Sequence, residues 1–236
     1  MGEALYLTNC YLKEFEAVVK SVAQGKYIVL DKTAFYPASG GQPYDTGVFI
    51  RQSDSKQFQV IYAGKFSGEI SHEVSEPGLK EGDKITGRIN WERRYKLMRM
   101  HTAAHILSAV FHQETGALIT GNQLDIEKSR IDFNLESFDR EKINDYIKKA
   151  NEIVKEDLLI KIYTMPKSAA TDPALFKLAK GIPEGIDEIR IVDIEGFDKQ
   201  ADGGTHLSST KEVGKIIFLK AENKGKENRR VYFALE

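Results

Sequence analysis

The chain of 236 residues is long enough for one large domain or two small ones. Its 34 Lys and Arg residues nearly cancel its 35 Asp and Glu residues, which excludes a general cationic field, so any nucleic-acid contact must come from local patches. The single cysteine, Cys10, excludes an intrachain disulfide and a zinc cluster made of thiolates. We expect a cytoplasmic protein, since the first residues carry no export signal and no apolar run approaches the roughly 18 residues that cross a bilayer.

The first 90 residues have the pattern of short strands separated by turns. They are rich in Val, Ile, Tyr and Phe, and glycines punctuate them. The predicted strands cover residues 17–22, 27–30, 47–50, 58–62, 69–74 and 84–89. Such spacing is typical of a small barrel. Residues 35–47 interrupt the pattern with several glycines and prolines, so we expect a specific loop there.

The sequence changes character at Asn90, a good N-cap, after which residues 91–115 predict one helix that ends at Gly116. We therefore expect a β-barrel domain at residues 1–90 and an α+β metal-binding domain at residues 91–236. In the second domain the predicted elements are a strand at 122–134, an amphipathic helix at 136–156, strands at 158–163 and 188–194, a short helix at 172–180 that ends at Gly181, and a hairpin of strands 213–220 and 230–235.

Two pairs of possible metal ligands lie far apart in the sequence. His101 and His105 are one turn apart on the long helix, and Asp202 and His206 flank a Gly-rich stretch. Three imidazoles and one carboxylate would suit Zn²⁺, with Gly203 and Gly204 letting the backbone turn and keeping bulky groups away. The alternative is that the paired histidines are ordinary half-buried residues of an amphipathic helix.

Two further histidines are not expected to take part. His112 lies about 10.5 Å along the helix from His105, too far to share an ion, and His72 has strand-like neighbours that favour a surface position. Thr102 stands where a zinc protease of the His-Glu-x-x-His type needs glutamate, so peptide hydrolysis of that kind is not expected.

Three motifs together resemble those of the AlaX family of free-standing alanyl-tRNA editing proteins, which are similar to the editing domain of alanyl-tRNA synthetase. They are the His101-x-x-x-His105 helix, the Gly203-Gly204-Thr205-His206 loop and the run Gly40-Gly41-Gln42-Pro43-Tyr44-Asp45. The order and spacing extend over nearly the whole chain. The resemblance therefore implies the medium-length type, with a small N-terminal β-barrel and an α+β editing domain of the threonyl/alanyl-tRNA synthetase type.

The resemblance also implies a function and a set of site residues. It implies ATP-independent hydrolysis of the ester that joins a wrong amino acid, chiefly serine and also glycine, to tRNA(Ala), with one Zn²⁺ per chain held by His101, His105, Asp202 and His206. It implies catalytic roles for Gln42, His101 and His105, and substrate contacts from Thr33, Gly40, Gly41, Gln42, Asp45, Gly203 and Gly204. Alternatively, Thr33 is a strand-end threonine that faces water, and Gln42 caps its own turn.

Asp202 departs from the family pattern, which has cysteine at this position. A carboxylate is a harder ligand than a thiolate, but Zn²⁺ accepts both, so we expect retained metal binding with weaker affinity or tolerance of other divalent ions. Two alternatives stay open. Asp202 could orient a histidine or a water around a three-histidine site, or its presence could abolish metal binding.

The expected partner is tRNA(Ala) carrying a wrong amino acid, bound by a monomer, with no membrane and no DNA. Two basic clusters could meet phosphates or be simply solvated: Arg93, Arg94, Lys96 and Arg99, and Lys220, Lys224, Lys226, Arg229 and Arg230. The alternative functions are a catalytically silent tRNA- or synthetase-binding module that has lost metal through Asp202, and a generic metal-dependent esterase.

Overall fold

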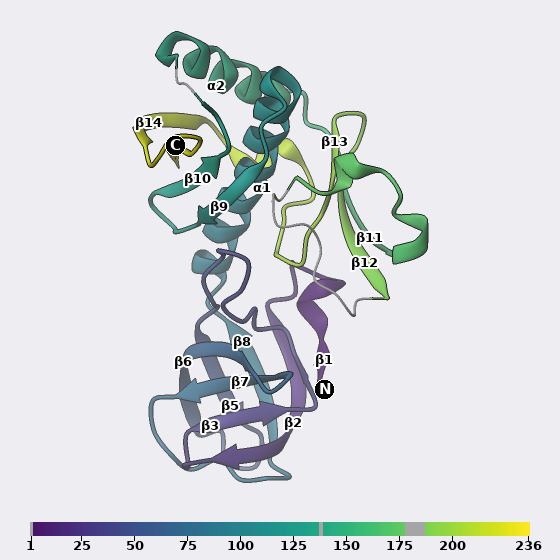
Figure 1. Cartoon of the computed structure of the whole chain (residues 1–236). Helices are drawn as coiled ribbons and strands as arrows, with labels where there is room; N and C mark the ends of the chain where they lie inside the picture. Colours follow the sequence, from purple (N-terminus) through teal and green to yellow (C-terminus); the bar gives the residue numbers. More distant parts are fainter. Residues whose placement is uncertain (1, 137–138, 178–186) are drawn as a thin grey trace. The chain divides into compact units, whose positions relative to one another are not determined.

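The computed structural model describes residues 2–136, 139–177 and 187–236 and divides the chain into two compact units, Met1–Lys96 and Leu97–Glu236 (Figure 1). The division falls within the long helix α1, Trp91–Thr115. The predicted helix end at Gly181 lies outside the described residues. Each unit has its own strands and its own buried core, so the two are described in turn.

The first unit contains a closed barrel with the strand order β2-β3-β7-β6-β5-β8, drawn in purple and blue in Figure 1. The strands are β2 (Glu14–Ala23), β3 (Tyr27–Leu30), β5 (Gly47–Arg51), β6 (Gln57–Phe66), β7 (Glu69–Val74) and β8 (Lys84–Ile89). Alternate residues of β2, such as Phe15, Ala17 and Val19, point into the core, as period-2 patterning requires. The predicted barrel is confirmed.

A small addition to this unit was not predicted. Strand β1 (Glu3–Ala4) pairs in parallel with β4 (Lys32–Thr33), and a 3₁₀ turn at Leu5–Leu7 follows β1. Strands of two residues are too short to show any periodicity in the sequence. They bring the N-terminal segment beside the chain that leads into the Gly-rich loop.

His72 shows where the local pattern of the sequence is misleading. The predicted surface position is wrong, because the side chain is completely buried in the barrel. Its Nδ1 donates to the carbonyl oxygen of Ile28 at 2.9 Å, and its Nε2 lies 2.9 Å from Oγ1 of Thr33. Burial lowers the pKa of His72 to about 4, against an opposing effect of the Ile28 carbonyl, so the ring is neutral at neutral pH.

Helix α1 ends at Thr115, and Gly116 follows with a positive φ of 72°, as the sequence predicts. Asn90 caps its start, since Oδ1 of Asn90 accepts the backbone N–H of Arg93 at 3.2 Å. Within the second unit every residue from Met100 to Phe111 is buried. This stretch of the helix is therefore enclosed on all sides and is not one face of an amphipathic surface helix.

The other elements of the second unit pack around α1. A four-stranded sheet has the order β14-β15-β10-β9, and a three-stranded sheet has the order β11-β12-β13. Their bounds are β9 (Ile119–Gln123), β10 (Ser129–Phe133), β11 (Ile160–Pro166), β12 (Glu188–Ile194), β13 (Asp198–Ala201), β14 (Ile216–Asn223) and β15 (Arg229–Leu235). Phe111 of α1 stacks on Phe133 of β10 with ring centroids 4.4 Å apart.

Two predicted boundaries in this unit need correction. The single strand expected at 122–134 is two antiparallel strands, β9 and β10, because residues 124–128 turn the chain back. Helix α2 (Arg140–Lys155) begins after the N-cap Asp139, whose side chain accepts the N–H of Glu141 at 2.9 Å, and not at residue 136. The expected hairpin is confirmed as β14 and β15.

The short helix expected at 172–180 appears, within the described part, as a 3₁₀ turn at Pro173–Leu175. Strand β13 was not predicted, although it leads directly into Asp202. In the portion of the chain that the structure describes, no helix combines the length and the apolar character needed to cross a membrane.

Candidate metal centre

The two predicted ligand pairs come together in the second unit. His101 and His105 lie on α1, while Asp202 and His206 lie on the loop that follows β13. One possible ligand atom from each of the four residues lies within 4.8 Å of those from the other three. The three imidazole centroids are 4.3 to 5.1 Å apart. A helix and a loop far apart in sequence thus converge on one point.

Asp202 faces the histidines directly. Its Oδ1 lies 3.0 Å from Nε2 of His206, and its Oδ2 lies 3.6 Å from Nε2 of His101. Among the described residues, no Lys or Arg side chain lies within ion-pair distance of this carboxylate. Arg190 instead donates to the backbone carbonyl oxygen of Asp202 at 2.8 Å.

The protonation states suit a divalent cation. Burial lowers the pKa of His101 to about 3 and lowers the pKa of His105 and His206 as well, so all three rings are neutral at neutral pH. Burial alone would raise the pKa of Asp202, but the facing imidazoles, His101 first, hold that pKa well below its usual range. Three neutral nitrogens and one carboxylate form a donor set that Zn²⁺ accepts.

Position 204 requires glycine because the His101 ring lies very close to its backbone. A Cβ added to Gly204 would overlap the ring of His101 and lie 2.9 Å from Oδ1 of Asp202. A Cβ at Gly203 would meet no heavy atom within 4 Å, and neither glycine has a positive φ. The expectation that both glycines are needed to turn the backbone is therefore wrong. Gly204 keeps bulk out of the cluster, and its N–H donates to Oδ1 of Asp202 at 2.6 Å.

Thr102 has a supporting role that the sequence did not reveal. Its Oγ1 lies 3.2 Å from Nδ1 of His206 and accepts the backbone N–H of Leu207 at 3.2 Å. Thr102 therefore fixes the ring of His206 with Nε2 turned toward Asp202, the kind of support that metal-bound histidines receive. The only signal in the sequence is its position beside His101.

Gln200 of β13 supports the helix behind His105. Its Nε2 donates to the carbonyl oxygen of His105 at 3.2 Å and to Oγ of Ser108 at 3.1 Å. His112, by contrast, is outside the cluster, and its Nδ1 donates to the carbonyl oxygen of Ala117 at 3.2 Å.

The Gly-rich loop belongs to the first unit and is described within it. Gly40 and Gly41 have φ of 57° and 85°, the left-handed conformation that a tight two-residue turn needs. The backbone N–H groups of Ser39 and Gln42 donate to each other's carbonyl oxygens at 3.2 and 2.9 Å. The backbone of Gln42 thus closes the turn, while its side chain is buried.

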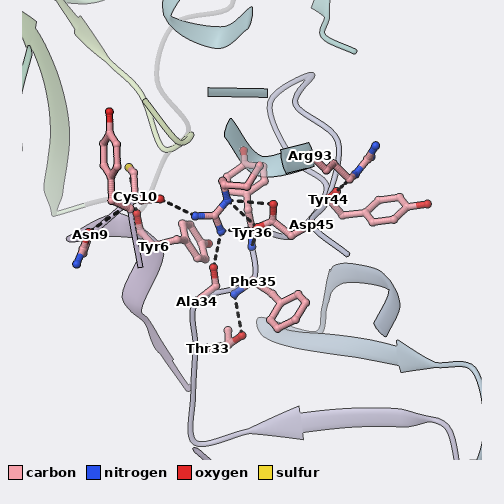
Figure 2. Close-up of polar contacts among 12 residues, drawn as sticks. Tyr6, Asn9, Cys10, Thr33, Ala34, Phe35, Tyr36, Tyr44, Asp45 and Arg93 are labelled. Carbon is pink, nitrogen blue, oxygen red and sulfur yellow. Dashed lines mark hydrogen bonds and ion pairs between the residues drawn. The ribbon is translucent and has the colours of Figure 1, made fainter. Parts of the chain in front are cut away.

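Asp45 anchors the end of this loop. Its carboxylate is completely buried, accepts the N–H of Tyr36 at 2.6 Å and forms an ion pair with Arg94, which is also completely buried. The Arg94 guanidinium donates in addition to the carbonyl oxygens of Cys10 at 2.8 Å and Ala34 at 2.6 Å. Figure 2 shows these polar contacts joining the N-terminal segment, the loop and the start of α1. The Asp45 carboxylate therefore holds the loop within the first unit, and the substrate contact expected of it stays a prediction.

Thr33 does not face water. Its side chain is buried, its hydroxyl donates to Nε2 of His72 at 2.9 Å, and its oxygen accepts the N–H of Phe35 at 3.1 Å. The substrate contact expected at Thr33 stays a prediction, and the structure adds a role in fixing the neutral form of His72.

Comparison with known proteins gives one family match in each of the two units. Residues 4–93 match the family model described as tRNA synthetases class II (A), and residues 189–232 match that described as threonyl and alanyl tRNA synthetase second additional domain. The fold and these matches define an α+β editing domain of the alanyl/threonyl-tRNA synthetase type preceded by a β-barrel.

Full-length relatives narrow the class. The chain is 54% identical to the alanyl-tRNA editing protein AlaX-M of Methanosarcina mazei, over 100% of this chain and 97% of that protein. It is 44% identical to the protein of the same name from Saccharolobus solfataricus, over the whole of both chains. It is 41% identical to the alanine–tRNA ligase of Pyrococcus abyssi, of which it matches 25%. The chain belongs to the AlaX-M family of alanyl-tRNA editing proteins.

Proposed function

We propose that this protein is a metal-dependent hydrolase that removes serine, and also glycine, from mischarged tRNA(Ala). The observation that carries the proposal is the group of three buried histidines, His101, His105 and His206, and the half-buried Asp202, whose donor atoms converge. Membership of a family whose relatives are named alanyl-tRNA editing proteins supports the choice of substrate. We further propose that it acts as a monomer in the cytoplasm and that Zn²⁺ is the resident ion.

The four ligands and their neighbours have distinct roles in this proposal. When bound, Zn²⁺ supplies a Lewis acid that can polarise the ester carbonyl or lower the pKa of an attacking water. His101, His105 and His206 would hold the ion through neutral nitrogens, and Asp202 through its carboxylate. Thr102 would keep the His206 ring oriented, and Gly204 would leave space beside His101.

Hydrolysis of a wrong ester is useful after an amino acid has been selected by a binding pocket, because the wrong amino acids are chemically close to alanine. Serine differs from alanine by one hydroxyl and glycine lacks one methyl, so a binding pocket alone discriminates weakly. We assign to Gln42 a hydrogen bond to the aminoacyl group, with Gly40 and Gly41 allowing close backbone approach. The tight Gly-Gly turn supports this assignment, because it fixes the backbone of Gln42.

The test combines metal analysis with deacylation. Purified protein should contain about one zinc per chain and should hydrolyse Ser-tRNA(Ala) faster than Ala-tRNA(Ala), and the variant His105→Ala should lose both zinc and activity. His112→Ala is the matched control, because His112 lies on the same helix outside the cluster. It should keep both.

Other outcomes distinguish the alternative functions. Protein without metal that binds tRNA but does not turn over Ser-tRNA(Ala) would be a silent binding module. Cleavage of small aminoacyl esters as fast as Ser-tRNA(Ala) would indicate a generic esterase. An Asp202→Cys variant with sharply higher zinc affinity would support Asp202 as a ligand, whereas unchanged affinity would make it an orienting residue. Size-exclusion chromatography with light scattering tests the monomer.

A further inference from the structure

The basic cluster predicted at the start of α1 is largely used within the protein. Arg94 is buried against Asp45, and Lys96 forms an ion pair with Glu92 at 2.8 Å. Arg99 donates to the backbone carbonyl oxygens of Val213 and Glu236. Arg94 and Arg99 are therefore poorly suited to bind phosphates, whereas the exposed pair of Lys96 holds that side chain only weakly.

The second cluster, on β14 and β15, is also largely paired with acidic or backbone groups. Lys220 and Lys224 flank Glu222 at 2.5 and 2.8 Å, and Arg230 contacts Asp132 at 2.7 Å. Arg229 is buried and donates to backbone carbonyl oxygens. This hairpin offers less free positive charge than its sequence suggests.

Arg93 differs from its neighbours. Across the described ranges, no carboxylate lies within ion-pair distance of its guanidinium. Its Nε donates to the carbonyl oxygen of Tyr44 at 3.2 Å, and its guanidinium carbon lies 5.6 Å from the centre of the Tyr44 ring. In Figure 2 the side chains of Arg93 and Tyr44 extend together, away from Asp45. An uncompensated cation thus lies against an aromatic ring.

Tyr44, which packs against the barrel core and is half-buried, begins a row of three neighbouring aromatic rings in the first unit. The Tyr44 ring centroid lies 4.5 Å from that of Tyr62, and the Tyr62 centroid lies 6.5 Å from that of Phe66. Tyr62 and Phe66 both lie on β6. Tyr44 and Tyr62 are half-buried, and Phe66 is 55% exposed. Three neighbouring rings thus reach the surface of one unit.

Gly64 allows the last two rings to converge. A Cβ at this position would lie 2.7 Å from the Tyr62 ring and 3.0 Å from the Phe66 ring. Glycine weakens a strand interior, and here its lack of a side chain lets two aromatic rings lean over the same stretch of β6. Lys65, exposed beside Phe66, likewise has no ion pair within the described ranges.

We propose that Arg93, Tyr44, Tyr62 and Phe66 form a stacking platform for unpaired bases of RNA. The inference rests on the proposed function, in which the substrate is a tRNA whose amino acid is carried on a single-stranded 3′ end. Exposed aromatic rings stack on bases with little sequence preference, and an uncompensated guanidinium attracts the phosphate backbone. Arg93, at the Tyr44 end of the row, carries a positive charge with no carboxylate partner among the described residues, and this charge favours an anionic occupant such as RNA.

The test measures binding of a labelled, unstructured oligoribonucleotide of about eight nucleotides to the whole protein. Phe66→Ala and Tyr62→Ala should each weaken binding by roughly five-fold or more, and Phe66→Trp should retain it. Leu219→Ala is a matched control, since Leu219 is an exposed apolar residue of the second unit, and should bind as wild type does. The KM for Ser-tRNA(Ala) should rise in the two weakened variants.

Gly64→Ala is the second variant, because it keeps every ring and charge but forces the rings apart, and it should also weaken binding. If Phe66→Ala, Tyr62→Ala and Gly64→Ala all bind the oligoribonucleotide within about two-fold of wild type, the platform is wrong. If wild type binds the oligoribonucleotide through these residues but deacylates no tRNA, the proposed function fails and the platform stands.

Discussion

Two loops of this protein combine paired glycines with an aspartate, yet they use both residue types differently. In the loop of the first unit, Asp45 is completely buried against the guanidinium of Arg94. In the loop of the second unit, Asp202 is partly exposed and faces neutral imidazoles. The guanidinium of Arg94 neutralises the Asp45 carboxylate, whereas the charge of a carboxylate among neutral nitrogens is not neutralised, so a cation can bind there.

The glycines of the two loops also have different roles. Gly40 and Gly41 are needed for their positive φ, which closes a tight turn. Gly204 has no positive φ and is needed because His101 lies where a Cβ would be. The paired glycines alone therefore do not reveal whether conformation or space is the requirement.

The largest effect is expected from breaking the ion pair of the first loop. Arg94→Met should lower the free energy of unfolding of the first unit by about 3 to 5 kcal/mol, because it leaves the Asp45 charge buried without a partner. Urea unfolding followed by the fluorescence of Trp91, the only tryptophan, measures this. Arg88→Met is the control, since its pair with Glu14 is exposed, and its effect should be below about 1 kcal/mol. Equal effects in the two variants would show that Arg94 is no anchor.

The second-largest effect is a loss of stability of the first unit at low pH. His72 has a pKa of about 4 when folded, below its ordinary value of 6.5, so its contribution to stability is complete above pH 6.5 and is lost as the pH falls to 4. The loss should reach about 3 kcal/mol. The difference between the unfolding free energies of wild type and His72→Gln, measured from pH 7 to pH 4, isolates it from other titrating groups. A pH-independent difference would contradict the buried neutral ring.

The sequence predicted the barrel and α1 from local periodicity and caps, and it predicted the convergence of the two ligand pairs from their spacing and from the motifs that resemble the AlaX family. It could not predict the partner of Arg94, because Asp45 lies 49 residues away in the sequence. Without that partner, Arg94 looks like one more solvated residue in a basic run. His72 was misplaced for the same reason: its two partners, Ile28 and Thr33, come from other strands. Pairings across the fold leave little trace in a single sequence.

The third prediction sets the two aspartates against each other. Asp202→Asn should weaken zinc binding at least about tenfold with little change in the stability of metal-free protein, since the residue is partly exposed and lacks a guanidinium partner. Asp45→Asn should do the opposite, lowering stability while the folded protein binds zinc as wild type does. Competition with a chromogenic chelator and urea unfolding measure the two quantities. If both substitutions changed both quantities alike, the contrast between the loops would fail.

The smallest effects separate the glycines of the two loops. Gly40→Ala should cost roughly 1 kcal/mol of stability through its positive φ alone, since a Cβ there meets nothing within 4 Å. Gly203→Ala should change stability and zinc affinity little, because it has neither a positive φ nor a close neighbour. Gly204→Ala should reduce zinc affinity clearly, because its Cβ must displace the His101 ring. Parallel metal and urea titrations of the three variants measure this, and equal zinc affinity in Gly203→Ala and Gly204→Ala would refute the requirement for space beside His101.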